Sequence, residues 1–437
     1  MITMDLSALK DVFAGNGCLK IYAKTLAPND NSKNQVYLGG SFELLNIFPI
    51  SSITTDPAGD WERERFKAAL PFSWITPEGH LSRAPRAQLI LYPKYPEVRF
   101  SGFLQGCDHP PSELMTQRLA GRILFLGVAA SGRLLGYVTS PHSDMAREFN
   151  RLAPQESLGV FQVIDLPAAA DNRKKLLLEL AKIHRQGWIG SKRLDKHGQV
   201  VPCNSPNCGG YTLEAELGIT PNGYSEPDYL GWEIKQFAVA NFARTNNSTI
   251  TLMTPEPTGG FYKNAGVPAF IHQYGYADKK GRSDRMNFGG VHRTDEMHKA
   301  TGLTLVLDGF DKASGRIRDS NGMIALMDKK GHIAASWSFA SLLLHWNKKH
   351  NQACYIPSRK SITAPTEYSY GNNILLCSGT SFDLFLQQMA AKNIVYDPGI
   401  KMENISSGSP TTKRRSQFRM VSGNLGRLYR TSEIVRV

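Results

Sequence analysis

The sequence predicts a two-domain protein, in which an all-β domain is followed by an α/β domain. Three observations predict this division. Residues 18–165 contain several short apolar segments of alternating polarity, separated by turns rich in glycine and proline. After residue 166 the hydrophobic spacing becomes that of helices alternating with strands. Residues 1–170 carry 16 basic and 16 acidic residues, so the whole formal surplus of +13 belongs to residues 171–437.

The first domain is expected to consist of short strands. Strands are predicted at residues 18–25, 87–92, 98–103, 123–129, 134–139 and 160–164. Residues 29–32 are asparagine, aspartate and serine, which favour a turn, and residues 35–39 are predicted to return as a strand beside the first one. Ser41 is a candidate cap for a short helix that ends before Pro49. Many short strands of this kind indicate a small barrel or a sandwich.

The boundary is expected directly after Leu166. We assign residues 1–166 to the first domain, residues 167–172 to a linker and residues 173–437 to the second domain. Beyond the linker, leucines and an isoleucine between residues 176 and 183 form a helical stripe, with Asp171 or Asn172 as its cap.

The second domain is expected to alternate helices and strands. Helices are predicted at residues 211–218 and 338–348, strands at residues 229–238, 249–254, 304–307, 353–357 and 418–421, and a polar, basic loop at residues 406–417. This order is typical of a mixed α/β domain.

The composition excludes several classes of protein. Hydrophobic residues make up 41% of the 437 residues, which is enough for more than one packed core and excludes a disordered chain. No apolar run approaches the ~18 residues of a membrane span. Asp5 and Asp11 interrupt the N-terminal segment, which argues against a secretory signal. Six cysteines in so long a chain do not form a disulfide framework. We therefore expect a cytoplasmic protein that does not enter a membrane.

The uneven charge points to nucleic acid as a partner. A basic surplus confined to one part of a chain is typical of a polyanion-binding surface, because phosphate contacts supply most of the nonspecific affinity for nucleic acid. The alternative is a basic surface that serves solubility alone.

A group of charged residues indicates the chemistry of the second domain. Asp228 precedes Glu233 by five residues, and Lys235 follows on the same apolar segment. Side chains alternate along a strand, so Glu233 and Lys235 project to one face, and a bend could return Asp228 beside Glu233. Two converging carboxylates bind a hard cation such as Mg²⁺, which activates water and neutralises charge on a phosphate. Lys235 could orient the nucleophile or stabilise the oxyanion.

This arrangement predicts a metal-dependent nuclease. The alternative for the same residues is a surface strand with solvated charges. Glu214 lies off the apolar stripe that Leu213 and Leu217 form on the preceding helix, so it could supply a further acid. An ordinary exposed glutamate is the alternative there.

The segment from Gly209 to Glu214, followed by Pro227-Asp228 and Glu233-Ile234-Lys235, resembles the MvaI/BcnI family of restriction endonucleases with its PD-(D/E)xK core. The resemblance continues in the same order through residues 176–193, 249–254, 336–339 and 417–420. It implies a Type II restriction endonuclease, a monomer with one active site. Such an enzyme hydrolyses double-stranded DNA with Mg²⁺ at a short C/G-rich sequence such as CCWGG or CCSGG. By this resemblance Asp228 and Glu233 are metal ligands, Lys235 is the catalytic lysine and Glu214 is an auxiliary acid.

The resemblance also places base reading in residues 397–419. This segment departs from the family pattern, because Lys413, Arg414 and Arg415 stand where relatives have histidines, and a phosphate clamp is the alternative for them. Arg419 matches best, and arginine can bridge guanine O6 and N7. The predicted DNA contacts of this domain are His292, Arg293, Asp397, Lys401, Lys413, Arg414, Arg415 and Arg419.

Residues 21–26, Asn29-Asp30 and residues 35–37 resemble the B3-like effector domain of EcoRII-type restriction enzymes. That resemblance implies an open β-pseudobarrel that clasps the DNA major groove with two arms, here residues 24–35 and 93–105. The predicted DNA contacts of this domain are Lys24, Asn29, Lys33, Gln35, Lys94, Arg99, Ser101 and Gln105. Fused to a nuclease, such a domain implies a Type IIE enzyme that binds two DNA copies, one on each domain. The balanced charge of residues 1–170 argues mildly against strong nonspecific binding there.

Other candidate sites are set aside. Cys203 and Cys208 have no second Cys/His pair at zinc spacing and are assigned to a structural loop. Cys354 and Cys377 lie on apolar segments and are assigned to the core.

Two alternatives to a restriction enzyme are kept. One is a repair-type nicking nuclease, and the other is a B3-type DNA-binding protein with an inert nuclease core. Intact Asp228, Glu233 and Lys235 argue against the second.

Overall fold

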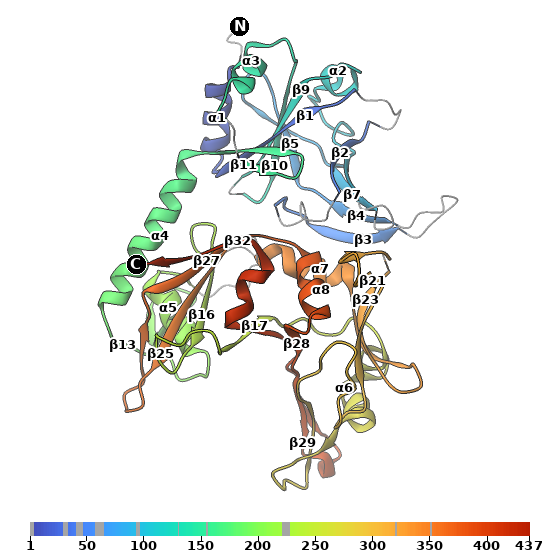
Figure 1. Ribbon diagram of the computed structural model, residues 1–437, viewed down its shortest axis with the longest axis vertical. Coiled ribbons are helices and arrows are strands. Elements are labelled where there is room, and N and C mark those ends of the chain that lie inside the picture. Colours follow the sequence, from blue (N-terminus) through green and yellow to red (C-terminus); the bar gives the residue numbers. More distant parts are fainter. Residues whose placement is uncertain are drawn as a thin grey trace. The chain divides into compact units, whose positions relative to one another are not determined.

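The chain folds into two compact units, Met1–Leu176 and Leu177–Val437 (Figure 1). The structure, a computed structural model, describes residues 4–28, 34–40, 47–56, 65–92, 97–129, 131–153, 156–220, 228–319, 321–349 and 352–437. Among these residues, no helix combines the length and the apolar character needed to span a membrane.

The first unit is mainly β-structure with short helices. Its helices are α1 (Leu6–Gly15), α2 (Ser112–Thr116) and α3 (Asp144–Asn150). Its strands are β1 (Lys20–Leu26), β2 (Val36–Gly39), β3 (Ser52–Asp56), β4 (Arg65–Ala69), β5 (Phe72–Ile75), β6 (Leu81–Arg83), β7 (Gln88–Tyr92), β8 (Glu97–Ser101), β9 (Arg122–Val128), β10 (Leu134–Thr139), β11 (Glu156–Leu158) and β12 (Phe161–Asp165).

These strands form two sheets that share an aromatic core. One sheet has the order β11-β12-β1-β9-β10-β5-β6 and the other β2-β8-β7-β4-β3. Phe72 of the first sheet packs edge-on against Phe100 of the second, with ring centroids 5.0 Å apart. Trp74 Nε1 donates a hydrogen bond to the Phe103 carbonyl at 2.7 Å, which ties the first sheet to the turn that follows β8. Within the described residues the pairings do not close into a barrel, so this unit is a two-sheet structure in which no pseudobarrel is evident.

The prediction that β2 returns beside β1 is wrong. It pairs with β8, whereas β1 lies between β12 and β9. The reason is burial: Ile21, Tyr22 and Ala23 are consecutive buried residues, so β1 is a central strand with partners on both edges. The predicted turn at residues 29–32 and most of the helix that follows Ser41 fall outside the described residues.

The predicted linker at residues 167–172 is helical. It forms the first turns of α4 (Pro167–Arg185), which begins at Pro167 rather than at Asp171 or Asn172. Proline suits the first helical position and the alanines that follow have the best helix propensity, so the sequence here favours a helix. Further along α4, Leu176 and Ile183 are buried, in agreement with the predicted stripe.

The second unit mixes helices and strands. Its helices are α5 (Cys208–Glu216), α6 (Phe261–Tyr274), α7 (Phe339–Lys349) and α8 (Phe382–Ala390), with 3-10 turns η2 (Ile405–Ser407) and η3 (Ser422–Leu428). Its strands are β13 (Ile189–Gly190), β14 (Lys192–Leu194), β15 (Val200–Pro202), β16 (Glu233–Ala238), β17 (Thr249–Met253), β18 (Tyr276–Ala277), β19 (Arg285–Gly289), β20 (Thr304–Asp308), β21 (Phe310–Asp311), β22 (Arg316–Ile317), β23 (Met323–Met327), β24 (Ile333–Ser338), β25 (Gln352–Lys360), β26 (Glu367–Tyr370), β27 (Asn373–Thr380), β28 (Ile394–Tyr396), β29 (Gly399–Glu403), β30 (Thr411–Lys413), β31 (Phe418–Val421) and β32 (Tyr429–Arg436).

One sheet of this unit carries the predicted catalytic strand. Its order is β13-β26-β25-β27-β32, and β16 joins it through parallel pairing with β25. A separate sheet, β18-β19-β29-β30, forms an arm that projects away from this catalytic sheet (Figure 1). The predicted polar loop at residues 406–417 includes β30, which pairs with β29.

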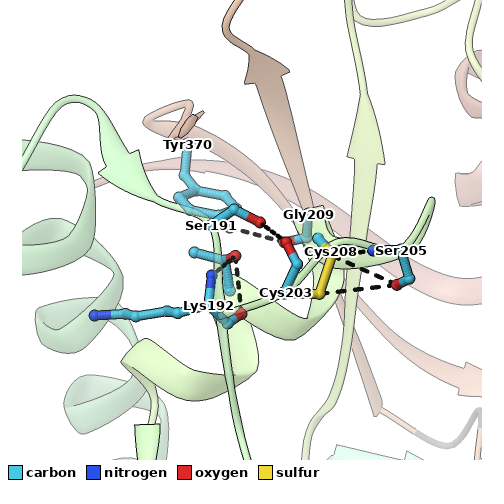
Figure 2. Close-up of a disulfide and its surroundings, with 8 residues drawn as sticks. Ser191, Lys192, Cys203, Ser205, Cys208, Gly209 and Tyr370 are labelled. Atoms are coloured by element: carbon cyan, nitrogen blue, oxygen red, sulfur yellow. Dashed lines mark hydrogen bonds between the residues drawn. A yellow bond between two sulfur atoms is a disulfide. The ribbon is translucent and has the colours of Figure 1, made fainter. Parts of the chain in front are cut away.

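A disulfide closes the loop before α5. Cys203 and Cys208 are joined, with their Cα atoms 5.7 Å apart (Figure 2). Ser191 Oγ donates to the Cys203 carbonyl at 2.7 Å, and Tyr370 Oη donates to the Gly209 carbonyl at 2.7 Å. These contacts fix the start of α5 against the sheet. A structural loop was predicted here from the sequence. Its disulfide was not predicted.

Candidate active site

A tight turn precedes the catalytic strand. Tyr229 N donates to the Trp232 carbonyl at 3.0 Å, and Trp232 N donates back to the Tyr229 carbonyl at 2.8 Å. The two residues between them have positive φ, 50° at Leu230 and 86° at Gly231. Two consecutive positive φ values are typical of the type I′ turn that connects hairpin strands. The chain therefore reverses direction directly before β16.

This turn brings Asp228 to the start of β16. The Tyr229–Trp232 bridge closes the turn, so Asp228 directly precedes the turn and Glu233 directly follows it. Asp228 Oδ2 accepts a hydrogen bond from Ile234 N at 3.0 Å, which holds its carboxylate against the strand. The bend that we expected from the spacing is thus provided by the hairpin turn.

Glu233 is buried and only half of its carboxylate is partnered. Its exposed fraction is 3%, and Lys235 Nζ donates to Glu233 Oε1 at 2.9 Å. Glu233 Oε2 is buried and has no hydrogen-bond partner among the described residues. An unpartnered carboxylate oxygen is costly away from water, and a cation would remove that cost. The buried carboxylate of Glu233, with one oxygen bonded to Lys235 and the other unpartnered, fits a hard cation, and Asp228 at the start of the same strand is the predicted second ligand.

Glu214, the predicted auxiliary acid, lies on α5, and its role stays a prediction. Gly209 of α5 lies against Gln236, which projects from the face of β16 opposite to Glu233 and Lys235. The charge of Glu214 contributes to a raised pKa of Tyr370, after burial and after Glu216, so Glu214 lies near Tyr370. Within the described part of the chain, no three histidine, cysteine, aspartate or glutamate side chains gather as a metal site. The auxiliary role of Glu214 therefore gains no support from this geometry.

Arg419 lies in a polar cluster on β31. Its Nη1 donates to Asp397 Oδ2 at 2.6 Å, and its Nε is buried without a partner among the described residues. Gln417 links this pair to β17: its Nε2 donates to the Asp397 carbonyl at 3.2 Å, and its Oε1 accepts from Thr251 Oγ1 at 3.1 Å. Sequence reasoning missed Gln417 and Thr251. The signal was the polar–apolar alternation of residues 417–420, which places Gln417 and Arg419 on one face.

The arm carries the predicted basic contacts. Lys401 and Lys413 are direct partners across β29 and β30. Like charges directly opposite each other are unfavourable. Glu403 relieves the repulsion in part, since Lys401 Nζ lies 2.7 Å from its Oε1. Lys413 is exposed, as are Arg414 and Arg415, so the arm presents a cluster of positive charge at its surface.

His292, one of the predicted DNA contacts, lies in the core. Its ring is fully buried, with Nδ1 2.9 Å from the Gly290 carbonyl and Nε2 3.0 Å from Thr301 Oγ1. The carbonyl can only accept, so Nδ1 carries the proton and Nε2 accepts from the threonine. Burial lowers the pKa of His292 to about 4, and His298 adds to this effect. A buried, neutral and fully bonded ring does not reach DNA, whereas Arg293 beside it is exposed.

Predicted contacts of the first unit lie near one another. Lys24 Nζ is 5.9 Å from the centre of the Tyr37 ring. Tyr37 pairs with Arg99 across β2 and β8, and the Arg99 guanidinium is 6.0 Å from the centre of the Tyr92 ring. Arg99 Nη2 also donates to Glu97 Oε2 at 3.1 Å. We call Lys24, Tyr37, Tyr92 and Arg99 the aromatic–basic patch. The two tyrosines were not among the predicted residues.

The other predicted residues of this unit differ in accessibility. Gln35 and Ser101 are partly buried and Gln105 is exposed. Asn29, Lys33 and Lys94 fall outside the described residues.

Comparisons with known proteins bear on this second unit. The sequence profile of the MvaI/BcnI restriction endonuclease family matches residues 177–429. A similar solved structure is that of the restriction endonuclease MvaI with its cognate DNA substrate, at 19% identity and a TM-score of 0.44, covering 60% of this chain and 97% of that chain. Another is MvaI in the absence of DNA, at 17% identity and a TM-score of 0.34, covering 61% and 98%. No curated protein sequence matches the chain. Because the family profile spans more than half of the residues and includes Asp228, Glu233 and Lys235, the chain belongs to the MvaI/BcnI restriction endonuclease family and is a site-specific deoxyribonuclease.

Proposed function

We propose that this enzyme hydrolyses double-stranded DNA within a short C/G-rich sequence and uses Mg²⁺ held by Asp228 and Glu233. The observation that carries the proposal is the carboxylate of Glu233. It is buried, one oxygen bonds Lys235, and the other oxygen has no partner among the described residues. A bound Mg²⁺ would supply Lewis-acid stabilisation of the phosphate and a more acidic water.

The protein residues have separate roles in this proposal. Asp228 and Glu233 supply oxygen ligands from the two sides of the hairpin turn. Lys235 Nζ, held at 2.9 Å by Glu233, orients the attacking water or donates to a non-bridging phosphate oxygen. The described residues contain one such group, so we further propose that the enzyme is a cytoplasmic monomer that cuts the two DNA strands in successive steps.

The experiment that tests this metal site compares Glu233→Gln with the wild type. The amide keeps the shape of the side chain but removes the charge that holds a cation. We expect loss of cleavage at saturating Mg²⁺, measured on plasmid DNA, with DNA binding retained in a mobility-shift assay. Asp165→Asn is the control, because it removes the charge of an aspartate–lysine pair of the first unit, 3.3 Å long, outside the nuclease unit. Full Mg²⁺-dependent cleavage by Glu233→Gln would rule out the proposed site.

We also propose that the first unit binds a second copy of the DNA, as a B3-like effector domain would. The supporting observation is the aromatic–basic patch, which brings residues from both predicted arms together. Lys24 and Arg99 can contact phosphates, and Tyr37, which is 45% exposed, can pack against the sugar–phosphate backbone. Such a unit makes the enzyme Type IIE, in which effector DNA raises the cleavage rate.

A further inference from the structure

A pair of buried tyrosines lies next to the catalytic strand. Tyr355 is the strand partner of Lys235 in the parallel pairing of β16 with β25. Paired residues of neighbouring strands project to the same face, so Tyr355 lies on the face that carries Glu233 and Lys235. Its ring is fully buried. Tyr355 therefore lies beside Lys235 on the face that carries Glu233.

The hydroxyl of Tyr355 is held by a second tyrosine. Tyr355 Oη and Tyr429 Oη are 2.8 Å apart in a buried hydrogen bond. Tyr429 is the first residue of β32, and its exposed fraction is 6%. A buried tyrosine hydroxyl normally needs a partner, and here each tyrosine serves the other. The bond therefore holds the end of each ring in place.

The negative charge of Glu233 affects the pKa of both tyrosine hydroxyls. Burial is the main cause of the raised pKa of Tyr355, and the negative charge of Glu233 adds to the rise. The same carboxylate contributes to the raised pKa of Tyr429, again after burial. The raised pKa values keep both tyrosines neutral, so neither adds a charge to the face that carries Glu233 and Lys235.

We propose that Tyr355, locked by Tyr429, is a positioning residue that keeps the unpartnered oxygen of Glu233 directed at the cation. A carboxylate that is 3% exposed and bonded through one oxygen alone could turn its free oxygen into the protein. A rigid aromatic wall on its own face prevents that movement. Residues behind a metal ligand act in this way when they restrict the orientation of the ligand. This inference rests on the metal site of the proposed function.

The experiment uses full-length Tyr355→Phe, Tyr429→Phe and the double variant. Each single variant leaves one buried hydroxyl without a partner and should lower the melting temperature. The double variant removes both hydroxyls, so it should regain most of that stability. If the pair positions Glu233, all three variants should raise the Mg²⁺ concentration for half-maximal cleavage by roughly tenfold, the lower end of the loss typical for residues behind a ligand.

Cation binding without DNA gives a readout apart from activity. The rise in melting temperature with added Mg²⁺ or Ca²⁺ should need correspondingly more cation in the double variant. Tyr370→Phe is the matched control, since it removes a buried hydroxyl from the same sheet, bonded to the Gly209 carbonyl at 2.7 Å, on the opposite face. It should lower stability and leave the cation dependence unchanged.

The outcomes separate the two proposals. A double variant with wild-type cation dependence would reduce the pair to a structural contact, and so would an equal change in Tyr370→Phe. Glu233→Gln is measured in parallel. If it still binds and responds to the cation as the wild type does, the metal site itself is wrong, and the failure lies with the proposed function.

Discussion

Within the described part of the chain, only some of the N–H groups of the Arg419 guanidinium have a hydrogen-bond partner. Asp397 orients the guanidinium through Nη1 at 2.6 Å, and the buried Nε has no partner among the described residues. A buried donor without an acceptor costs about 1–3 kcal/mol. An acceptor on the DNA, on a base or on a phosphate, would remove part of that cost, and we propose that Arg419 reads a base. Lys413 differs from it, because it is exposed on the arm.

We therefore expect different effects from Arg419→Ala and Lys413→Ala. Arg419→Ala should weaken binding to specific DNA by about 1–3 kcal/mol and leave random DNA nearly unaffected. Lys413→Ala should weaken both, and it should reduce the slope of log affinity against log salt by about one unit. Titrations at several salt concentrations with both DNAs measure this. Equal losses on both DNAs for Arg419→Ala would make it a phosphate contact.

At the scale of one element, helix α8 carries an unfavourable carboxylate. Ser381 caps the helix through a hydrogen bond from Leu384 N at 3.0 Å, and Asp383 lies in its first turn. Asp383 Oδ1 is buried without a partner among the described residues. Burial raises the pKa of Asp383 to about 6, although the Ile317 amide and Arg316 oppose the shift.

This pKa predicts how stability depends on pH. The folded protein holds the Asp383 proton more tightly than the unfolded chain does, so the contribution of this group falls as the pH rises from about 4 to about 6. Asp383→Asn should therefore stabilise the protein at neutral pH, by about 3 kcal/mol at most, and the gain should vanish near pH 4. Melting temperatures of both proteins across this range test it. Parallel curves at every pH would contradict the assigned burial.

The elements also show what the sequence alone could predict. Strands β10 and β31 match their predicted ranges, because each is a short apolar segment between clear turn residues. The partner of β2 could not be predicted, since pairing depends on which distant strand shares its core. The burial of His292 depends on Gly290 and Thr301, which the charge pattern does not reveal.

In the candidate site, strand alternation predicts that Glu233 and Lys235 share a face, and the 2.9 Å bond between their side chains agrees with this. A metal site that also includes Asp228 stays a prediction. The role of Glu214 stays one too, since the spacing does not show which face of the sheet α5 covers. The disulfide likewise depends on a close approach of two cysteines that sequence spacing does not establish.

At the scale of the whole chain, the question is whether the first unit influences cleavage. If it binds effector DNA, plasmids with two sites should be cut faster than plasmids with one site. The coupling between two binding sites is usually about 1–3 kcal/mol, so the difference should be about 5–150-fold. A short cognate duplex added in trans should rescue slow cleavage of the one-site plasmid. Lys24→Ala combined with Arg99→Ala should remove this response, because it removes both charges of the aromatic–basic patch.

The fragment 167–437 is the complementary test. It includes all of α4 together with Asp228, Glu233 and Lys235, so it should cleave DNA without responding to added duplex. Equal rates of the full-length enzyme on one-site and two-site plasmids, with added duplex acting only as a competitor, would exclude the effector role. The first unit would then serve as an additional DNA anchor.

Helix α4 determines how the two units can be separated by a protease. The boundary after Leu176 falls inside a helix of 19 residues, rather than in an exposed loop. Arg173, Lys174 and Lys175 directly precede it and are suitable residues for trypsin. A protease needs extended, accessible backbone, so these bonds become available only when the helix opens locally. Trypsin resistance between the units is therefore a measure of the integrity of α4, and an intact chain after digestion does not mean that the protein is a single domain.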